Sequence, residues 1–356
     1  MQSLREEISR IDSQLLELVA RRAEVAEEIG RVKSRSGLPS RDPAREKHVK
    51  ASFARSARRL GIREDLAIEL ASLLIDDAVK TQSKAAPKTL RGKSALVVGG
   101  SGRMGAWTCR FLSGRGASVK VWDPRGTLPG YASVKSLNKV AIESDYVVIA
   151  SPLGAAAEEL EEVLNSSPQG IVFDLCSVKA HIARDIKNAA GEGIRITSIH
   201  PMFGPRVASP RGRNVIVCRS GCPGADRDIA DLFSSAGAKI TKIDLDSHDR
   251  LMAYVLGLPH LCTLVFAASA EKSRIPFTDL ARVQGPSFER MARSAIELSK
   301  ESRRVYHDIQ LLNPNSRGMI SQMEKAFHDV RGAAVAKGSE AYRDIIDRCE
   351  KYLEVC

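Results

Sequence analysis

The residues from 95 to 123 constrain the fold more than any other part of the sequence. An apolar run at residues 95–98 precedes glycines at positions 100, 102 and 105, and a helical segment then leads into an apolar alternation that ends at Asp123. This order is typical of a dinucleotide-binding βαβ unit: a strand, a glycine-rich turn, a helix, a second strand and an acidic residue. The sequence therefore predicts a Rossmann-type α/β domain.

Each glycine of this turn has an expected steric role. Gly100 allows the tight turn, Gly102 lets the backbone approach a pyrophosphate, and Gly105 permits close packing of the helix on the strand. Free N–H groups and the positive end of the helix dipole attract the phosphates. The residues expected around the phosphates are Gly100, Ser101, Gly102, Arg103, Met104 and Gly105.

Asp123 is expected to select the cofactor. A carboxylate at the end of the second strand accepts hydrogen bonds from the adenosine ribose hydroxyls and repels a 2′-phosphate, so NAD is favoured over NADP. Arg125 leaves NADP as the alternative, because a nearby arginine can accommodate that phosphate. Ser151 and Pro152 end a further apolar run, residues 145–150, where the nicotinamide half is expected.

The composition narrows the class of protein. A chain of 356 residues is long enough for two or three domains, and its net charge of +11 indicates anionic partners. Small anions are favoured over nucleic acid, because the basic residues are dispersed and aromatic residues make up only 5% of the chain. The seven cysteines lack CxxC or zinc spacing, which predicts no metal site and fits a reducing cytoplasm. No apolar run reaches about 18 residues and no signal-peptide core is present, so neither a membrane span nor secretion is expected.

Residues 3–35 are predicted to form one long helix. Its apolar stripe comprises Leu4, Ile8, Ile11, Leu15, Leu18, Val25 and Ile29. Arg22 falls on or beside this stripe, either as a snorkelling side chain at the edge of a core or as a cation that faces a bound anion. Lys33 projects from nearly the same face, whereas Arg5 lies roughly 25 Å from Arg22 along the axis. Arg5 can serve the same small ligand only from a second copy of the chain, which predicts a dimer.

Two further helices are expected before the glycine-rich turn. Residues 37–39 are expected to break the first helix. The second helix is expected to begin with Asp42 as its N-cap and Pro43 at its first position, and to end at Gly61. Residues 84–88 are expected to form a linker. The third helix, at about residues 63–82, has an apolar side made up of Leu66, Leu70, Leu73, Leu74 and Ala78.

The first 85 residues resemble the all-helical chorismate mutase family. The matching positions are Leu4-Arg5-x-x-Ile8-x-x-Ile11-Asp12-x-x-Leu15-Leu16, Arg22, Lys33, Asp42-x-x-Arg45-Glu46 and Thr81-Gln82. The resemblance implies that the helices of two chains interlock. It also implies a pocket lined by Arg22, Lys33, Arg45, Glu46 and Gln82 of one chain together with the partner's Arg5. Ala78 occupies a position where the family often has a serine that touches a substrate carboxylate.

The chemistry of that family suits these residues. Chorismate rearranges to prephenate without a nucleophile or a proton transfer, so the protein need only hold two carboxylates and stabilise charge on the breaking ether oxygen. Arginines bind carboxylates bidentately, and Lys33 and Gln82 can donate to the ether oxygen. A helical oligomerisation module is the alternative, and it leaves Arg22 on an apolar face unexplained.

Polar residues follow several strands predicted beyond the glycine-rich turn. The apolar runs at residues 145–150, 170–174 and 194–199 lead to Ser151, Ser177 and His200, and residues 214–218 and 239–243 are predicted to be further strands. Open α/β sheets bind ligands beyond the carboxyl ends of their strands. A lone histidine is usually structural, but His200 is placed on that edge before a loop rich in proline and glycine, which makes it the candidate base. From residue 247 to about 352 the pattern is helical, with an interruption or kink at residues 258–260 and a second candidate dimer face.

From about Lys93 onward the chain resembles prephenate dehydrogenases. The matching motifs are the glycine-rich turn at 99–105, Asp174-x-x-Ser177-Val178-Lys179, His200-Pro201-Met202-Phe203-Gly204-Pro205, His248-Asp249 and Leu258-Pro259-His260. The resemblance implies that His200 takes the proton of the substrate's ring hydroxyl and that Ser177 supports His200. It places His260 near the substrate and gives Arg290 the task of binding a substrate carboxylate, with Arg293 as the other candidate.

Together the two resemblances indicate a bifunctional, homodimeric enzyme of tyrosine biosynthesis. Chorismate would rearrange to prephenate, which NAD-dependent oxidation and decarboxylation would convert to 4-hydroxyphenylpyruvate. The expected organisation is a three-helix domain at 1–85, a linker at 86–92, a Rossmann domain at 93–245 and a helical substrate and dimerisation domain at 246–356. The alternatives are arogenate as substrate, a β-hydroxyacid-type dehydrogenase that uses a lysine, or a regulatory protein that senses NAD.

Overall fold

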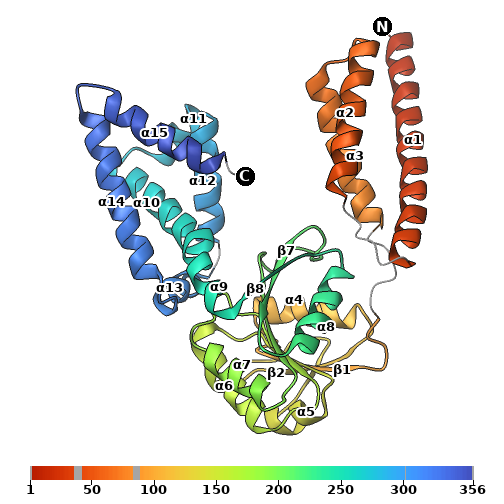
Figure 1. Cartoon of the computed structure of the whole chain (residues 1–356), viewed down its shortest axis with the longest axis vertical. Helices are drawn as coiled ribbons and strands as arrows, with labels where there is room; N and C mark the ends of the chain where they lie inside the picture. Colours follow the sequence, from red (N-terminus) through yellow and green to blue (C-terminus); the bar gives the residue numbers. More distant parts are fainter. Residues whose placement is uncertain (1, 36–41, 83–88, 301, 355–356) are drawn as a thin grey trace.

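A computed structural model of the chain describes residues 2–35, 42–82, 89–300 and 302–354. Figure 1 shows an N-terminal group of helices, a central sheet covered by helices, and a C-terminal group of helices. This order of an all-α part, a Rossmann-type part and a second all-α part confirms the predicted fold class.

The N-terminal helices are α1 (Gln2–Arg35), α2 (Pro43–Leu60) and α3 (Glu64–Gln82), and α3 packs against both of the others. The predicted limits of α2 are confirmed. The carboxylate of Asp42 accepts the N–H of Arg45 at 3.0 Å, and Gly61 has a left-handed φ of +69° with its N–H bonded to Ala57 O. The expected break at 37–39 and the linker at 84–88 lie outside the described residues.

The buried face of α3 differs from the predicted one. Ala67, Ala71 and Ile75 are buried within the chain, whereas Leu66, Leu70 and Leu73 are exposed; Ala78 is buried as expected. Small side chains let helices approach closely, so the alanines occupy the intrachain contacts and the leucines face outward. The stripe predicted on α1 is exposed in the same way, at Ile8, Ile11, Leu15, Leu18, Val25 and Ile29. These apolar faces are available to a second chain.

The central sheet has the strand order β3-β2-β1-β4-β5-β6-β7-β8. The pair β6/β7 is antiparallel and the other pairs are parallel. Because β1 lies between β2 and β4, the carboxyl ends of these strands meet at one edge of the sheet, as expected for a Rossmann-type fold. The strands are β1 (Ser94–Val98), β2 (Ser118–Trp122), β3 (Ala132–Ser133), β4 (Tyr146–Ile149), β5 (Ile171–Asp174), β6 (Ile196–Pro201), β7 (Asn214–Arg219) and β8 (Lys239–Asp244).

Helices cover both faces of the sheet (Figure 1). On one face α4 (Arg103–Ser113) and α8 (Pro223–Ser234) form a core with residues such as Val97 and Phe173. The other face is covered by α5 (Leu137–Glu143), α6 (Leu153–Asn165) and α7 (Ala183–Gly191). Side chains alternate along a strand, so His200 lies on the same face of β6 as Ile196, which belongs to this second core. β6 extends through His200, which is therefore part of the strand and does not follow it as predicted.

The C-terminal part begins with a continuous helical stretch, α9 (Leu245–Met252), the π-helical turn η1 (Ala253–Gly257) and α10 (Leu258–Lys272). The predicted kink is realised as this wider turn just before Pro259, with the N–H of Leu258 bonded to Ala253 O. Proline lacks an N–H donor and crowds the preceding turn, which the wider turn relieves. The remaining helices are α11 (Phe277–Arg282), α12 (Pro286–Ser299), α13 (Arg303–Leu312), α14 (Ser316–Val335) and α15 (Glu340–Leu353).

The stretch from α9 to α10 is unusually apolar for its exposure. Its most apolar window has a mean hydropathy of 1.8 and is only 17% buried, so by length and composition it meets the criteria for a membrane span. This differs from the expectation that no such segment exists. None of the residues of α10 is buried within the described chain, and even its large apolar side chains Leu264 and Val265 are exposed. The core helix of a soluble protein satisfies the same criteria, but this helix is mostly exposed in the described chain, so its apolar surface is a candidate for contact with another chain.

Candidate functional site

The glycine-rich loop lies between β1 and α4, where close packing excludes larger residues. Gly99 has a left-handed φ of +73°, and a Cβ atom there would lie 2.7 Å from Ser151 Cα. A Cβ at Gly105 would lie 2.2 Å from Gly99 O, and one at Gly100 would lie 2.6 Å from Val121 Cγ1. Gly105 is closely packed, as predicted, but against the backbone of the loop at Gly99 and Gly100 rather than against a strand. The left-handed residue of the turn is Gly99, which was not selected from the sequence.

The carboxylate of Asp123 holds this loop from the end of β2. Its side chain is fully buried and accepts the N–H of Ser101 at 3.2 Å, the hydroxyl of Ser101 and the N–H of Arg125 at 2.9 Å. Ser151 Oγ is buried nearby and interacts with the carboxylate of Glu159. These groups fit a dinucleotide: an acceptor at the end of β2, a helix N-terminus without a side-chain cap, and a buried hydroxyl.

We expect Gly105→Ala to weaken NAD⁺ binding by at least about 10-fold, because an added Cβ must displace the backbone of the loop. Fluorescence titration of the full chain with NAD⁺ measures this. Gly126→Ala is the matched control, since no atom lies within 4 Å of its Cβ position and its φ is not left-handed. Equal affinity of the two variants would contradict the assigned role of the loop.

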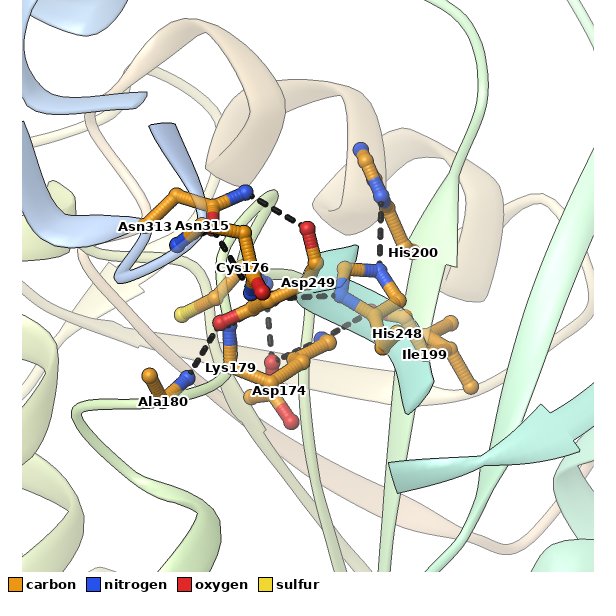
Figure 2. A network of polar contacts seen from close by, with 10 residues as sticks. All are labelled: Asp174, Cys176, Lys179, Ala180, Ile199, His200, His248, Asp249, Asn313 and Asn315. Carbon is orange, nitrogen blue, oxygen red and sulfur yellow. Dashed lines mark hydrogen bonds and ion pairs between the residues drawn. The ribbon is translucent and has the colours of Figure 1, made fainter. Parts of the chain in front are cut away.

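A buried polar network lies at the carboxyl ends of β5 and β6 (Figure 2). Lys179, whose side chain is 1% exposed, donates from Nζ to Asp174 Oδ1 at 2.5 Å and to Ile199 O at 2.7 Å. Asp174 Oδ1 also accepts the N–H of Cys176 at 2.8 Å. These contacts hold the loop after β5 against the last residues of β6.

His200 joins this network through α9. Its Nδ1 lies 3.1 Å from Nε2 of His248, and Nδ1 of His248 lies 2.7 Å from Asp249 Oδ1. The Asp249 carboxylate also accepts the N–H groups of Lys179 at 2.8 Å and Ala180 at 2.7 Å. Figure 2 shows the other ring nitrogen of His200 pointing away from these residues.

Burial sets the protonation states of these groups. Desolvation, reinforced by the charges of His248 and Lys179, lowers the pKa of His200 well below its ordinary value of 6.5. Desolvation also lowers the pKa of His248, against the opposing effect of its hydrogen bond to Asp249. Burial works to raise the pKa of Asp249, but hydrogen bonds from His248 and Lys179 outweigh it and the pKa is lowered. The pair is therefore a neutral histidine dyad beside an ionised carboxylate at neutral pH.

Other predicted dehydrogenase residues stay apart from this network in the chain. No hydrogen bond joins Ser177 to His200 within the described residues, although Ser177 lies only two residues before Lys179. The ring of His260 packs edge-on against Tyr306 at 4.4 Å, and its Nδ1 is buried without a partner in the described part of the chain. Arg290 is exposed and donates to Ser287 on its own helix, and Arg293 pairs with Glu289.

The predicted mutase residues are likewise spread over the N-terminal helices. Arg22 is half-buried on α1 and donates to Leu74 O of α3, which gives this cation a partner inside the chain. Lys33 lines a hollow of about 320 Å³ with Val25, Glu28 and Ile29. Arg5 and Arg45 are exposed, Glu46 is half-buried, and the side chain of Gln82 lies outside the described set.

The roles of Lys179, His248 and Asp249 were not predicted from the sequence, although the motifs that contain them were identified. Asn313 was not predicted either; its buried amide, at the C-terminal end of α13, donates to Asp249 O at 2.7 Å. A lysine shortly after a predicted buried strand and an adjacent histidine and aspartate are the sequence signals for buried pairing. The residues that meet here lie 48 to 70 positions apart, so spacing alone did not reveal the pairs.

Family models describe most of the chain. Residues 4–83 match chorismate mutase type II, residues 129–242 match the nucleotide-binding domain of prephenate dehydrogenase, and residues 244–347 match the prephenate dehydrogenase dimerization domain. The glycine-rich loop precedes the second matched range, so its assignment depends on the geometry given above.

Individual relatives agree with these families. The T-protein of Enterobacter agglomerans is 25% identical over 352 residues, 98% of this chain and 92% of that protein. The 4-amino-4-deoxychorismate mutase of Streptomyces venezuelae is 34% identical over 82 residues, 23% of this chain and 80% of that protein. The A. aeolicus prephenate dehydrogenase in complex with hydroxyphenyl propionate and NAD⁺ shares the fold, with a TM-score of 0.59 at 19% identity over 74% of this chain and 98% of that one. The chain therefore belongs to the type II chorismate mutase family in its N-terminal part and to the prephenate dehydrogenase family in the remainder.

Proposed function

We propose that this chain catalyses two consecutive reactions of tyrosine biosynthesis, the rearrangement of chorismate to prephenate and the NAD-dependent oxidative decarboxylation of prephenate to 4-hydroxyphenylpyruvate. The observation that carries the second activity is the buried His200, neutral at physiological pH, with one ring nitrogen held and the other directed out of the network. We assign the mutase to residues 1–85, the linker to 86–92, the nucleotide-binding domain to 93–245 and the helical domain to 246–356.

The mutase site is proposed to form between two chains. Arg22, Lys33, Arg45, Glu46 and Gln82 of one chain are proposed to surround chorismate together with the partner's Arg5. The arginines bind carboxylates, and the cations stabilise the negative charge that develops on the ether oxygen as its bond breaks. The exposed leucines and isoleucines of α1 and α3 support this assembly, because a single chain leaves them in water.

We expect Arg22→Ala to lower the rate of chorismate rearrangement by about 100-fold or more, because a carboxylate-binding cation is lost from an electrostatic site. Prephenate oxidation by the same protein should be unchanged, since Arg22 lies on α1 and bonds within the N-terminal helices. Absorbance of chorismate measures the rate. Arg10→Ala, at an exposed position on the same helix, is the control. Equal mutase activity in both variants would argue that Arg22 only joins α1 to α3.

The dehydrogenase site is proposed to lie beyond the carboxyl ends of β4, β5 and β6. Gly99, Ser101 and the start of α4 would hold the pyrophosphate, Asp123 the adenosine ribose, and Ser151 and Pro152 the nicotinamide half. Bound NAD⁺ supplies the hydride acceptor. His200 takes the proton of the ring hydroxyl, supported by Ser177. His260 lies near the substrate, and Arg290 or Arg293 binds its side-chain carboxylate.

The decarboxylation step needs little from the protein. Oxidation of the ring alcohol places a ketone across the ring from the carbon that bears the carboxylate. Loss of carbon dioxide then makes the ring aromatic, and this gain makes the step effectively irreversible. Arogenate, which carries an amino group where prephenate has a keto group, remains the alternative substrate.

We also propose that the enzyme is a cytoplasmic homodimer. α10 exposes an apolar surface with no buried residue in the described chain, and it falls in the range matched by the dimerization domain.

One coupled assay tests the function. Purified full chain is supplied with chorismate and NAD⁺ while NADH is followed, and the assay is repeated with prephenate, arogenate and NADP⁺. NADH from chorismate supports both activities, and sedimentation velocity on the same sample gives the number of chains. NADH from prephenate alone would remove the mutase assignment. No NADH from any combination would overturn the dehydrogenase assignment in favour of NAD sensing.

A further inference from the structure

The hydrogen bonds around His200 have only one consistent direction. Asp249 accepts N–H groups from Lys179 and Ala180 and has a lowered pKa, so it is an ionised acceptor. Its contact at 2.7 Å with His248 therefore requires the proton on Nδ1 of His248. A neutral His248 then has its lone pair on Nε2, which faces Nδ1 of His200 at 3.1 Å.

The proton on His248 in turn determines the tautomer of His200. Because Nε2 of His248 is an acceptor, Nδ1 of His200 must be the donor. The lone pair of a neutral His200 is then on Nε2, the ring nitrogen that points away from the network in Figure 2. A base needs its lone pair on the atom that meets the substrate. The opposite tautomer would present an N–H to the hydroxyl that must be deprotonated.

We propose that His248 is a positioning residue for the dehydrogenase reaction, which with Asp249 fixes the tautomer of His200 and shares the proton that His200 takes from the substrate. This inference rests on the proposed function, because it needs His200 as the base. Neither His248 nor Asp249 touches the substrate in this scheme. Their position resembles that of the histidine-orienting carboxylate in hydrolase triads, with one more imidazole in the chain.

The proton balance of the reaction fits a relay without an exit to solvent. Oxidation of the ring alcohol releases one proton, which bonds to Nε2 of His200, while the Nδ1 proton of His200 moves toward Nε2 of His248. Decarboxylation then leaves the electron pair of the broken carbon–carbon bond on the ring oxygen, which takes the proton back to form the phenol. His200 and His248 thus end each turnover in the protonation states in which they began. His200 is 6% exposed and His248 is 0% exposed, so a proton stored there is shielded from water between the two steps.

Neighbouring residues hold Asp249 in place and set the charge around the two histidines. The backbone of Asp249 is fixed by the amide of Asn313, and its carboxylate by the loop after β5. Lys179 is the positive group nearest the dyad and opposes a cation on His200. The carboxylate of Asp249 is therefore the group that stabilises the dyad when it is protonated.

The test compares His248→Leu and His248→Gln in the full chain. Leucine removes the acceptor, and we expect kcat for prephenate oxidation to fall about 100-fold with KM for prephenate nearly unchanged. Glutamine can accept the Nδ1 proton of His200 but cannot take up a further proton, so we expect partial rescue, with a loss of about 10-fold. His307→Leu, at an exposed histidine on α13, is the control. Chorismate mutase activity and NAD⁺ affinity of each variant report whether the chain has folded.

Imidazole ¹⁵N NMR gives a second readout that a purely structural role would not move. In the wild type without substrate, His200 should show a protonated Nδ1 and an unprotonated Nε2, and His200→Asn assigns the signals. In His248→Leu the two tautomers should be mixed, whereas His248→Gln should restore the first. Wild-type kcat in His248→Leu, or a lower kcat with an unchanged tautomer, would overturn the proposal. A wild type that is inactive on prephenate would instead overturn the proposed function, and the NMR would still decide the tautomer assignment.

Discussion

His200→Asn is expected to lower prephenate oxidation by a factor of about 10³, within the range of 10² to 10⁴ for loss of a general base. The asparagine amide can still donate to Nε2 of His248, so the buried network should survive, but no lone pair of suitable basicity faces the hydroxyl. The measurement is kcat with saturating NAD⁺. NAD⁺ affinity and chorismate rearrangement should match the wild type, because the glycine-rich loop and the N-terminal helices are separate from His200.

A dehydrogenase that uses a lysine for acid–base chemistry would tolerate this substitution, so substantial activity in His200→Asn would revive the β-hydroxyacid-type alternative. The pH dependence gives a second check. Burial lowers the pKa of His200 well below 6.5, so the base remains neutral and active as the pH falls through 6.5. We expect kcat/KM to decline only at a lower pH. A decline centred at or above 6.5 would contradict a buried base.

Lys179→Met is expected to destabilise the dehydrogenase part of the chain by about 3–5 kcal/mol, the usual cost of breaking a buried ion pair. Lys179 and Asp174 are each 1% exposed, and methionine would leave the Asp174 carboxylate without its counter-ion. Loss of the Nζ contact to Ile199 O would add to the effect. Denaturant unfolding followed by the fluorescence of Trp107, which packs in the core beside α8, measures the change.

The double variant Asp174→Asn/Lys179→Met separates charge from packing. Asparagine removes the buried charge and still accepts the N–H of Cys176, so most of the lost stability should return. Little recovery in the double variant would mean that the lysine contributes through its packing and its bond to Ile199. Wild-type stability in Lys179→Met alone would contradict the burial of an ionised pair.

The sequence was sufficient to predict the architecture because local rules decide it. Asp42, Pro43 and Gly61 set the limits of α2 through N-cap, first-turn and left-handed positions, which depend on neighbours in the chain. The glycine-rich turn between two apolar strands specified a parallel sheet with its ligand edge. The predicted base, His200, lies on that edge for the same reason.

The apolar stripes show where this reasoning fails. Periodicity placed the leucines of α3 and the isoleucines of α1 on apolar faces, yet on α3 the chain itself buries Ala67, Ala71 and Ile75. A pattern states that a face avoids water, but it does not state whether the same chain or another one covers it. The exposed faces of α1, α3 and α10 belong to that second case.

Local patterns in the sequence are enough to predict the fold class, the dinucleotide loop and the candidate base. How that base is held depends on the folded chain: Asp174 and Lys179 pair in the core, Asp249 accepts backbone N–H groups from a loop 70 positions away, and His248 faces His200 from α9. The physical reason is that a motif specifies which side chains are present, whereas the direction of a hydrogen bond and the protonation of a buried group depend on partners that the fold brings together. Those partners, and not His200 alone, set the tautomer that makes it a base.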